Sequence, residues 1–232
     1  VQRWGEGDLS VRVAVQGDDE VADLSERFNA AAERIEGLMA SQKSLLANAS
    51  HELRSPLARI RMGLELMNGP VDADALARSR AEILRNMAEL DQLIDEILLA
   101  SRLDAQEADI GTVEAVDLVG LCAEECARLG ASFDVPEGLT QLDVPGVAKL
   151  LRRMVRNLLE NARRYGAAAD QADAVVLSLH TESAQVVLRV QDRGPGVPPA
   201  YLDRIFEPFF RLPGASERIG GVGLGLALVK SI

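Results

Sequence analysis

The chain has 232 residues, which is room for one or two domains. Its formal net charge of −11 at pH 7 argues against nucleic acid as the main partner, because a phosphate backbone is bound by a surplus of Lys and Arg. Hydrophobic residues make up 47% of the chain and aromatic residues only 3%, so aliphatic helical cores are expected. No apolar run approaches the length of a membrane span and no signal peptide is evident, so this fragment is expected to be soluble and cytoplasmic.

The first segment, residues 1–39, is predicted to be a connector followed by a helix. Trp4-Gly5-Glu6-Gly7-Asp8 contains turn residues, and valines then alternate with other residues over a short extended run from Val11 to Val15. Asp18-Asp19-Glu20 supplies a helix cap and first-turn acids. The helix that follows has apolar residues in steps of three and four, which predict a narrow coiled-coil seam of Val21, Leu24, Phe28, Ala31 and Ile35.

The second segment, residues 40–107, is predicted to be a helical hairpin that ends its first helix at Asn68-Gly69-Pro70. Asp72 or Asp74 can cap the second helix. Two amphipathic helices cannot enclose a core, so two copies are expected to form a four-helix bundle, which makes the protein a homodimer. Apolar stripes carry this prediction, namely Leu45, Leu46, Ala49, Leu53, Leu57, Ile60, Leu64 and Met67, then Leu76, Ile83, Met87, Leu90, Ile94 and Ile97.

His51 is the candidate reactive residue of this hairpin. A neutral imidazole is well suited to accept and return a phosphoryl group near neutral pH. Glu52 can orient the ring and accept its proton, and the hydroxyl of Ser55, one turn later, can position a water. Pro56 is expected to bend or loosen the turn that carries the histidine. The alternative is an ordinary histidine on a coiled-coil helix.

The third segment, residues 117–232, follows a linker at 108–116 and is predicted to be an α/β sandwich. Strands are expected at 132–135, 175–180 and 186–191, the last two joined by a hairpin at 181–184, with a long helix over 145–165. Cys122 and Cys126 are four residues apart on one helix face without a histidine or second cysteine pair, so buried reduced thiols are favoured over a zinc site. His180 is assigned no chemistry.

Asn157 and Asn161 begin a candidate nucleotide site, because residues at i and i+4 share a helix face. Two neutral oxygen donors suit a Mg²⁺ ion whose charge is already neutralised by phosphates. Tyr165 can cover a base and Arg164 can reach a phosphate. Taken alone, the two asparagines fit caps or surface polar residues equally well.

Two glycine-containing stretches extend this site. Asp192 ends a strand and can accept a hydrogen bond from an adenine amino group, while Gly194 and Gly196 allow close backbone approach; an ordinary strand-end turn is the alternative. The second stretch opens a helix with Gly220-Gly221-Val222-Gly223-Leu224-Gly225, a nest able to hold phosphate. It matches neither the P-loop nor the Rossmann pattern. Between the two lies the apolar segment Ile205-Phe206-Glu207-Pro208-Phe209-Phe210-Arg211.

These motifs resemble those of the sensor histidine kinases of two-component signalling. His51-Glu52-Leu53-Arg54-Ser55-Pro56-Leu57 is similar to the family's H-box, with serine where many members have threonine. The downstream clusters resemble, in order, the N, G1, F and G2 boxes, and residues 1–39 look like the second half of a HAMP linker. The resemblance implies the ATP-binding (GHKL, Bergerat) fold shared with gyrase, Hsp90 and MutL, here C-terminally incomplete because closing strands are expected after Ile232.

The resemblance also implies functional roles. The partners would be a second copy of the chain and the receiver domain of a response regulator, with the membrane reached only through N-terminal segments of a longer parent. ATP and Mg²⁺ would be the cofactors, and residues 211–220 would form a mobile lid over ATP. His51 would be phosphorylated with help from Glu52, and phosphatase activity through Ser55 stays open. The nucleotide and metal would contact Asn157, Asn161, Arg164, Tyr165, Asp192, Gly194, Gly196, Phe206, Arg211, Gly221, Gly223, Leu224 and Gly225, the metal being held by Asn157 and Asn161.

Two other functions fit part of the chain. A degenerate kinase could act as a dimeric scaffold or as a regulator-binding phosphatase, although intact His51, Asn161 and Asp192 argue against degeneracy. A GHKL-type ATPase or chaperone without phosphotransfer would leave His51 incidental and would turn over ATP without forming a phosphoprotein.

Overall fold

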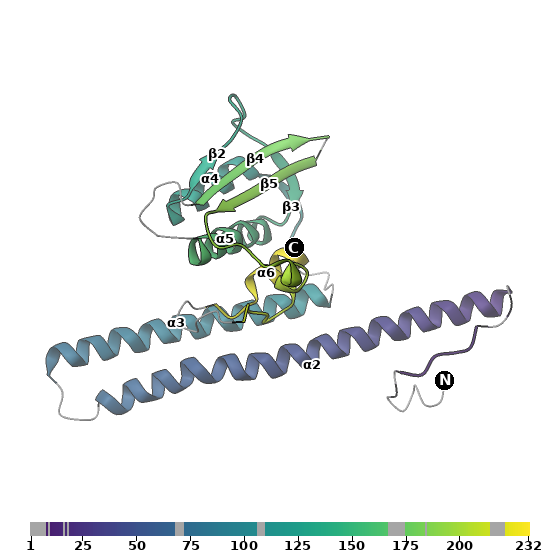
Figure 1. The fold of residues 1–232 in the computed structure, drawn as a ribbon, viewed down its shortest axis with the longest axis horizontal. Coiled ribbons are helices and arrows are strands. Elements are labelled where there is room, and N and C mark those ends of the chain that lie inside the picture. Colours follow the sequence, from purple (N-terminus) through teal and green to yellow (C-terminus); the bar gives the residue numbers. More distant parts are fainter. Residues whose placement is uncertain are drawn as a thin grey trace. The chain divides into compact units, whose positions relative to one another are not determined.

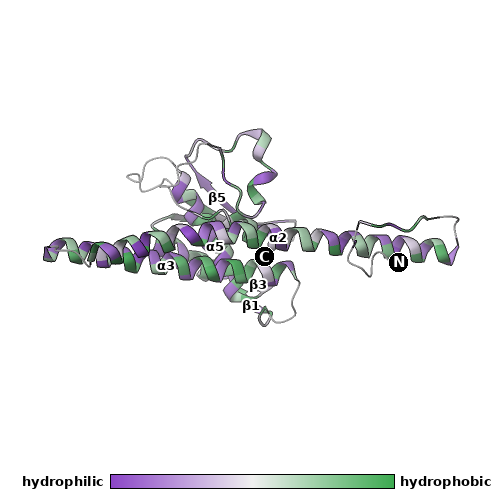
Figure 2. Ribbon diagram, turned by 90° about the horizontal axis from the view of Figure 1, so that it is seen from below, coloured by the Kyte–Doolittle hydropathy of each residue, from purple (hydrophilic) through white to green (hydrophobic). Residues whose placement is uncertain are grey.

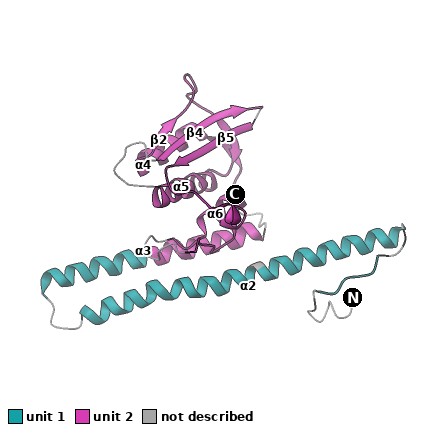
Figure 3. Cartoon of the chain, in the orientation of Figure 1, with its two compact units in different colours: residues 1–87 teal, residues 88–232 magenta. Residues whose placement is uncertain are grey.

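The computed structural model describes residues 8, 10–15, 17, 19–67, 72–105, 110–166, 175–183, 185–213 and 221–232. It divides into two compact units, residues 1–87 and 88–232, which are described separately (Figure 3). The predicted turn at Asn68-Gly69-Pro70 and most of the predicted connector at residues 4–9 lie outside the described residues.

The first unit is built on α2, a helix from Glu20 to Met67 (Figure 1). Asp19 caps it, since its Oδ1 accepts a hydrogen bond from the Ala22 backbone N–H at 3.0 Å, which confirms the predicted acidic cap. The helix continues unbroken through Pro56, so the expected loosening does not interrupt it. It also runs without a break across the predicted segment boundary between residues 39 and 40, a boundary that stays a prediction.

A short segment before α2 lies against that helix through one asparagine. The Asn29 side chain accepts a hydrogen bond from the Val13 backbone N–H and donates one to the Val13 carbonyl, both at 2.8 Å. Arg12 and Glu36 add an ion pair at 2.7 Å. The segment around Val13 is therefore attached to α2 by paired backbone groups.

Helix α3 runs from Ala73 to Asp104 and is capped by Asp72, whose Oδ1 accepts from the Ala75 N–H at 2.6 Å. Within the first unit it packs against α2 near Gly63, where an added Cβ would lie 2.8 Å from Ile83 Cγ1. A glycine at 63 therefore lets the helices approach closely. Figure 2 shows hydrophilic and hydrophobic residues interspersed along both helices, as an amphipathic hairpin requires.

The second unit is an α/β domain, as predicted. Strand β2 (Ser132–Asp134) pairs in parallel with β4 (Val175–Glu182), and β4 pairs antiparallel with β5 (Gln185–Asp192). Strands β1 (Glu114–Asp117) and β3 (Asp143–Gly146) form a separate antiparallel pair. The helices are α4 (Leu118–Leu129), α5 (Ala148–Tyr165) and α6 (Gly225–Ser231), with 3₁₀ turns η1 (Pro199–Tyr201) and η2 (Arg204–Phe206).

The core of this domain lies between one face of the sheet and helices α4 and α5 (Figure 1). Alternating residues of β4 point into it and are almost completely buried, as a half-covered strand requires. Its main members are Leu121, Cys122, Cys126, Val155, Leu159, Val175, Leu177 and Leu179. Both cysteines are free and buried, which confirms the prediction of reduced thiols.

Three details of the predicted strands and helices need correction. Strand β1 begins at Glu114, inside the predicted linker 108–116, and β3 was not predicted. Pro145 lies in β3, so α5 begins at Ala148 instead of residue 145. Glu182 pairs with Gln185, which lengthens both hairpin strands beyond the prediction. Four-residue strands such as β1 and β3 are too short to show a hydrophobic period, which explains the omissions.

A buried ionic cluster joins α4 to α5. Glu125 is 2% exposed and accepts hydrogen bonds from Arg156 and Arg152. Burial by itself raises the pKa of this carboxyl, but the hydrogen bonds from the two arginines outweigh burial and lower the pKa of Glu125 overall.

Among the described helices, none is both long and apolar enough to cross a lipid bilayer.

Candidate functional site

The second unit contains a pocket of about 150 Å³ at the C-terminal half of α5 and the end of β5. Five residues predicted from the sequence line it: Asn161, Tyr165, Asp192, Gly196 and Arg211. Apolar walls complete it, formed by Pro195, Val197, Ile205, Phe210, Leu212 and Leu226. Convergence of a few polar groups on a largely apolar pocket is typical of ligand sites.

Asp192 is held in a defined orientation at the mouth of this pocket. Its Oδ1 accepts a hydrogen bond from the Gly194 backbone N–H at 2.8 Å. Gly194 also passes close to the end of α5, because an added Cβ would lie 2.3 Å from the Tyr165 carbonyl oxygen. Gly196 has a φ of +73°, which favours glycine there. The two predicted glycines thus bring the turn after β5 against the residues that line the pocket.

The two asparagines of α5 are placed differently from each other. Asn161 lines the pocket, whereas Asn157 is 6% exposed and its Nδ2 donates to the Gly225 carbonyl at 3.1 Å. Asn157 thus connects α5 to α6 and does not line the pocket, and its role as a second ligand of the metal stays a prediction. Both residues have the same signal in the sequence, and only packing against α6 distinguishes them.

Arg164 lies against the glycine-rich segment. A Cβ added at Gly221 would lie 2.2 Å from Arg164 Nη1, so the guanidinium occupies the space above that glycine. Gly221 has a φ of +147° and Gly223 of +81°. The Arg164 guanidinium therefore lies next to the backbone of the glycine-rich segment, and a side chain at position 221 would displace it. A cation beside open backbone N–H groups is the arrangement that an anion-binding segment needs.

A second aromatic residue, Phe210, lines the pocket beside Tyr165, and the sequence did not single it out. Phe206 does not line the pocket; Lys230 Nζ lies 5.9 Å from its ring centroid. Phe210 is held by Tyr201 at a ring-centroid distance of 5.8 Å and by Arg204, whose Cζ lies 4.5 Å from the ring centroid. Both phenylalanines belong to one apolar segment, so no local signal distinguishes them.

The other predicted glycine-segment residues border the pocket without lining it. Leu224 is completely buried and packs in the core, and its contact with nucleotide stays a prediction. Gly225 begins α6, and a Cβ added there would lie at ordinary van der Waals distance from the Asn157 side chain. Gly220, the start of the predicted nest, and residues 214–220 of the predicted lid lie outside the described residues.

His51 belongs to the first unit, on α2. Its side chain is exposed, Glu52 is half-buried, and Ser55 is exposed one helical turn later on the same face. An exposed imidazole on a helix is accessible to a phosphoryl donor and then to a phosphoryl acceptor.

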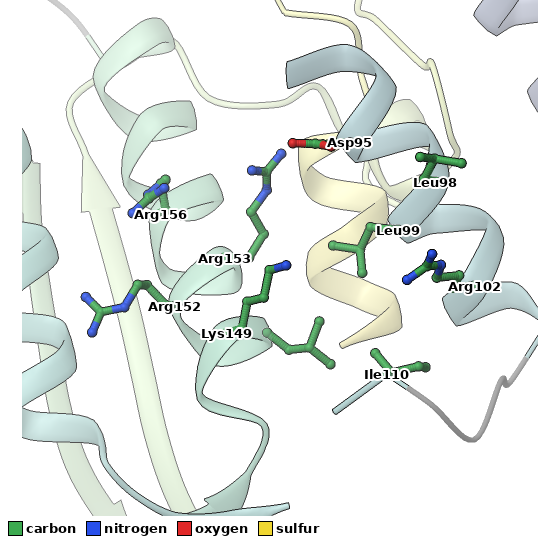
Figure 4. Close-up of a pocket in the computed structure, with 10 residues that line it drawn as sticks. Asp95, Leu98, Leu99, Arg102, Ile110, Lys149, Arg152, Arg153 and Arg156 are labelled. Atoms are coloured by element: carbon green, nitrogen blue, oxygen red, sulfur yellow. The ribbon is translucent and has the colours of Figure 1, made fainter. Parts of the chain in front are cut away.

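A second cavity of about 320 Å³ in the second unit is lined by the C-terminal part of α3, Ile110 and the N-terminal half of α5 (Figure 4). It is rich in arginine, but three of its cations are already compensated. Arg152 pairs with Glu124 and Arg153 with Glu96, each at 2.7 Å, and Arg156 makes two hydrogen bonds of 3.0 Å to Glu125. Three arginines that line the cavity are therefore held in ion pairs within the second unit.

Three family models match the chain. Residues 146–232 match the family described as "Histidine kinase-, DNA gyrase B-, and HSP90-like ATPase", residues 41–106 match the "His Kinase A (phospho-acceptor) domain" and residues 1–37 match the "HAMP domain". The pocket around Asn161 and Asp192 therefore lies in an ATP-binding domain, and His51 lies in a phospho-acceptor domain.

Individual proteins give the same result. The chain is 33% identical over 243 residues to the sensor protein RstB of Escherichia coli, covering 100% of this chain and 52% of RstB. It is 31% identical to the signal transduction histidine-protein kinase/phosphatase MprB of Mycolicibacterium vanbaalenii, covering 95% of this chain and 46% of MprB. The chain thus spans about half the length of the curated relatives it matches.

Among solved structures, the histidine kinase AdeS of Acinetobacter baumannii has the same fold, with a TM-score of 0.58 and 22% identity over 78% of this chain and 84% of AdeS. The ordered set of three domains and the curated relatives show that the chain belongs to the sensor histidine kinase family.

Proposed function

We propose that the chain transfers the γ-phosphoryl group of ATP to His51 and then passes it to an aspartate on a response-regulator receiver domain. One observation carries this proposal: an exposed histidine in a phospho-acceptor domain is followed, in the same chain, by a pocket in an ATP-binding domain. An ATPase without phosphotransfer would need no such histidine.

In the proposed complex the adenine ring enters the pocket at the end of α5. The Asp192 carboxylate accepts a hydrogen bond from the adenine amino group, and its bond to Gly194 keeps it in place. Tyr165 and Phe210 supply apolar surface for the base. The pocket volume of 150 Å³ is below the roughly 300–1,000 Å³ that encloses a whole drug-sized ligand, so the described walls suit the base alone. The triphosphate is then directed towards Arg164 and the glycine-rich segment.

Mg²⁺ is proposed to bind together with the nucleotide. Among the described residues, no group of three or more His, Cys, Asp or Glu side chains is arranged to hold a metal ion. Magnesium coordinated by phosphates and water needs few protein ligands, and the amide oxygen of Asn161 fits that need. Bound there, the ion would neutralise charge on the transferring phosphoryl group.

The transfer step requires little covalent chemistry from the protein. An imidazole nitrogen of His51 bonds to the γ-phosphorus, the bond between that phosphorus and the β–γ bridging oxygen breaks, and ADP leaves with the electron pair. Glu52 accepts the proton released from the ring. Catalysis then depends on positioning and charge neutralisation, which the two separate domains supply.

The chain is also proposed to act as a homodimer. Several residues of the predicted α2 stripe are exposed in a single chain, including Leu46 at 64%, Leu57 at 52% and Leu64 at 51%. An apolar helical face of this kind is covered when two hairpins form a four-helix bundle. Size-exclusion chromatography with light scattering tests this, and a monomer at micromolar concentration would contradict it.

A second activity, hydrolysis of the phosphorylated regulator, is favoured by one observation. Ser55 is exposed on the same helical face as His51, where its hydroxyl can position a water. MprB, a relative, is described as a kinase/phosphatase.

We also propose that the chain works on the cytoplasmic side of a longer, membrane-attached sensor, which membrane fractionation of the native protein tests.

Labelled Mg-ATP tests the kinase proposal directly. The wild-type chain is expected to incorporate acid-labile, base-stable label, and His51→Gln is expected to incorporate none while binding ATP normally. ATP turnover without any phosphoprotein would favour the ATPase alternative. Label that persists in His51→Gln would show that another residue is the acceptor.

A further inference from the structure

Phe209 has an unusual backbone conformation beside the nucleotide pocket. Its φ is +64°, and among the described residues Ser183 is the only other non-glycine residue with a positive φ. Ser183 sits in the β4–β5 turn, where such a conformation is common. For a bulky L-residue the left-handed region is disfavoured by about tenfold or more in population. A strained residue next to a binding site is a candidate for a functional role.

One hydrogen bond holds Phe209 in this conformation. Its backbone N–H donates to the Gly223 carbonyl at 2.9 Å. Gly223 itself has a φ of +81°, and an added Cβ would lie 2.8 Å from the Phe209 carbonyl carbon and 2.9 Å from the Phe210 oxygen. The two backbones are therefore in direct contact, and each needs a left-handed conformation for the contact to form.

This contact joins two walls of the proposed nucleotide site. On one side, Phe210, Arg211 and Leu212 follow Phe209 immediately and line the pocket. On the other side, Gly223 follows Gly221, above which the Arg164 guanidinium lies. The position of the base-binding wall relative to the phosphate-binding segment thus depends on the backbone at residue 209.

We propose that Phe209 is a positioning residue for the nucleotide, and that it acts through its left-handed backbone and not through its ring. The Phe209–Gly223 contact is formed in only part of the unliganded molecules and becomes fully formed when nucleotide binds. This inference rests on the proposed function, since it assigns the pocket to ATP. The apparent dissociation constant then equals the intrinsic one divided by the fraction of molecules in the competent state.

The proposal predicts an order of affinities set by backbone preference. Gly and Asn tolerate a positive φ and raise the competent fraction, Leu resembles Phe in backbone preference but lacks the ring, and β-branched Ile disfavours the conformation further. Phe209→Gly and Phe209→Asn should bind nucleotide roughly three- to tenfold more tightly than wild type, Phe209→Leu should match wild type, and Phe209→Ile should bind several-fold more weakly.

The test is isothermal titration of the chain and its four variants with AMPPNP in the presence of Mg²⁺, together with the melting temperature of each unliganded protein. Autophosphorylation adds a second readout, in which the KM for ATP follows the same order while kcat changes little. Ser183→Gly is the matched control, because it relieves a comparable strain in the β4–β5 turn away from the pocket. It should raise the melting temperature without changing affinity.

Four outcomes are distinguished. Affinities in the predicted order support the proposal. Equal affinities with altered melting temperatures would show that Phe209 has a purely structural role. Weakened binding in the Gly, Asn and Leu variants alike would show that the ring of Phe209 is what matters. Either result overturns the proposal. A wild-type chain that fails to bind AMPPNP overturns both this inference and the proposed nucleotide site, whereas equal affinities overturn only the role of Phe209.

Discussion

The Asn157 side chain donates a hydrogen bond to the Gly225 carbonyl at 3.1 Å and thereby joins α5 to α6. Asn157 is 6% exposed, so its amide has little access to water. Asn161, one turn later on α5, lines the nucleotide pocket instead. Two asparagines on one helix face therefore have different surroundings, one bonded to α6 and the other lining the pocket.

Asn157→Ala is expected to lower stability. It removes the hydrogen bond by which a buried side chain of α5 reaches the Gly225 carbonyl, and such a bond typically contributes about 0.5–1.5 kcal/mol. Urea denaturation followed by circular dichroism measures the loss. A variant as stable as the wild type would show that the hydrogen bond contributes nothing to the fold.

Asn161→Ala is expected to have the opposite profile. The side chain lines an open pocket, so stability should change by less than about 0.5 kcal/mol, as for most substitutions away from the core. Affinity for Mg-ATP should fall at least roughly tenfold if its oxygen binds the metal. Titration with ATP with and without Mg²⁺ checks the assignment, because the defect should be confined to the magnesium-containing titration.

Asp192→Asn is expected to separate folding from adenine recognition. The amide oxygen can still accept the Gly194 N–H that Asp192 now binds at 2.8 Å, so the melting temperature should be nearly unchanged. An amide in place of the carboxylate weakens a charge-assisted hydrogen bond to the adenine amino group, and roughly tenfold or greater loss of ATP affinity follows. Inosine triphosphate, which lacks that amino group, is the control; it should discriminate little between the two proteins.

The Glu96–Arg153 pair of the second unit should show strong coupling in a double-mutant cycle. Glu96 is 8% exposed and accepts from Arg153 at 2.7 Å and from Gln92 at 3.0 Å. Arg153→Met leaves a buried carboxylate without its cation, which costs about 3–5 kcal/mol, whereas Glu96→Met combined with Arg153→Met should be much closer to wild type. Additive losses in the cycle, measured by denaturation, would contradict a direct interaction.

Cys122 and Cys126 should make stability fall at alkaline pH. Burial raises the pKa of Cys122 from 9.0 to about 12 and that of Cys126 to about 11. Above pH 9 the unfolded chain loses these protons while the folded chain keeps them, so the free energy of unfolding decreases as pH rises from 9 towards 11. The thiols of the folded protein should also resist modification at pH 8.

The control for that prediction is Cys122→Ala combined with Cys126→Ala. Its free energy of unfolding, compared with that of the wild type at each pH, should lose the part of the alkaline decrease that the thiols cause. Rapid labelling of both cysteines in the folded wild type at pH 8 would contradict their burial.

The family of this protein can be recognised from its sequence alone. His51, Asn161 and Asp192 can be proposed as site residues because each lies in a motif whose spacing along one helix or at one strand end is local. The helical hairpin and the α/β domain followed from hydrophobic periods long enough to read. Local spacing is encoded in neighbouring residues, so no knowledge of distant contacts was needed.

The sequence does not show which of several equivalent residues line the pocket, because their orientation depends on the folded chain. Phe210 and not Phe206 lines it, Asn157 bonds to α6, and Leu224 is buried, because packing between segments far apart in the chain fixes these orientations. The same holds for Arg164 above Gly221 and for the left-handed Phe209 against Gly223. Long-range contacts select one side-chain direction among several that the local sequence permits equally.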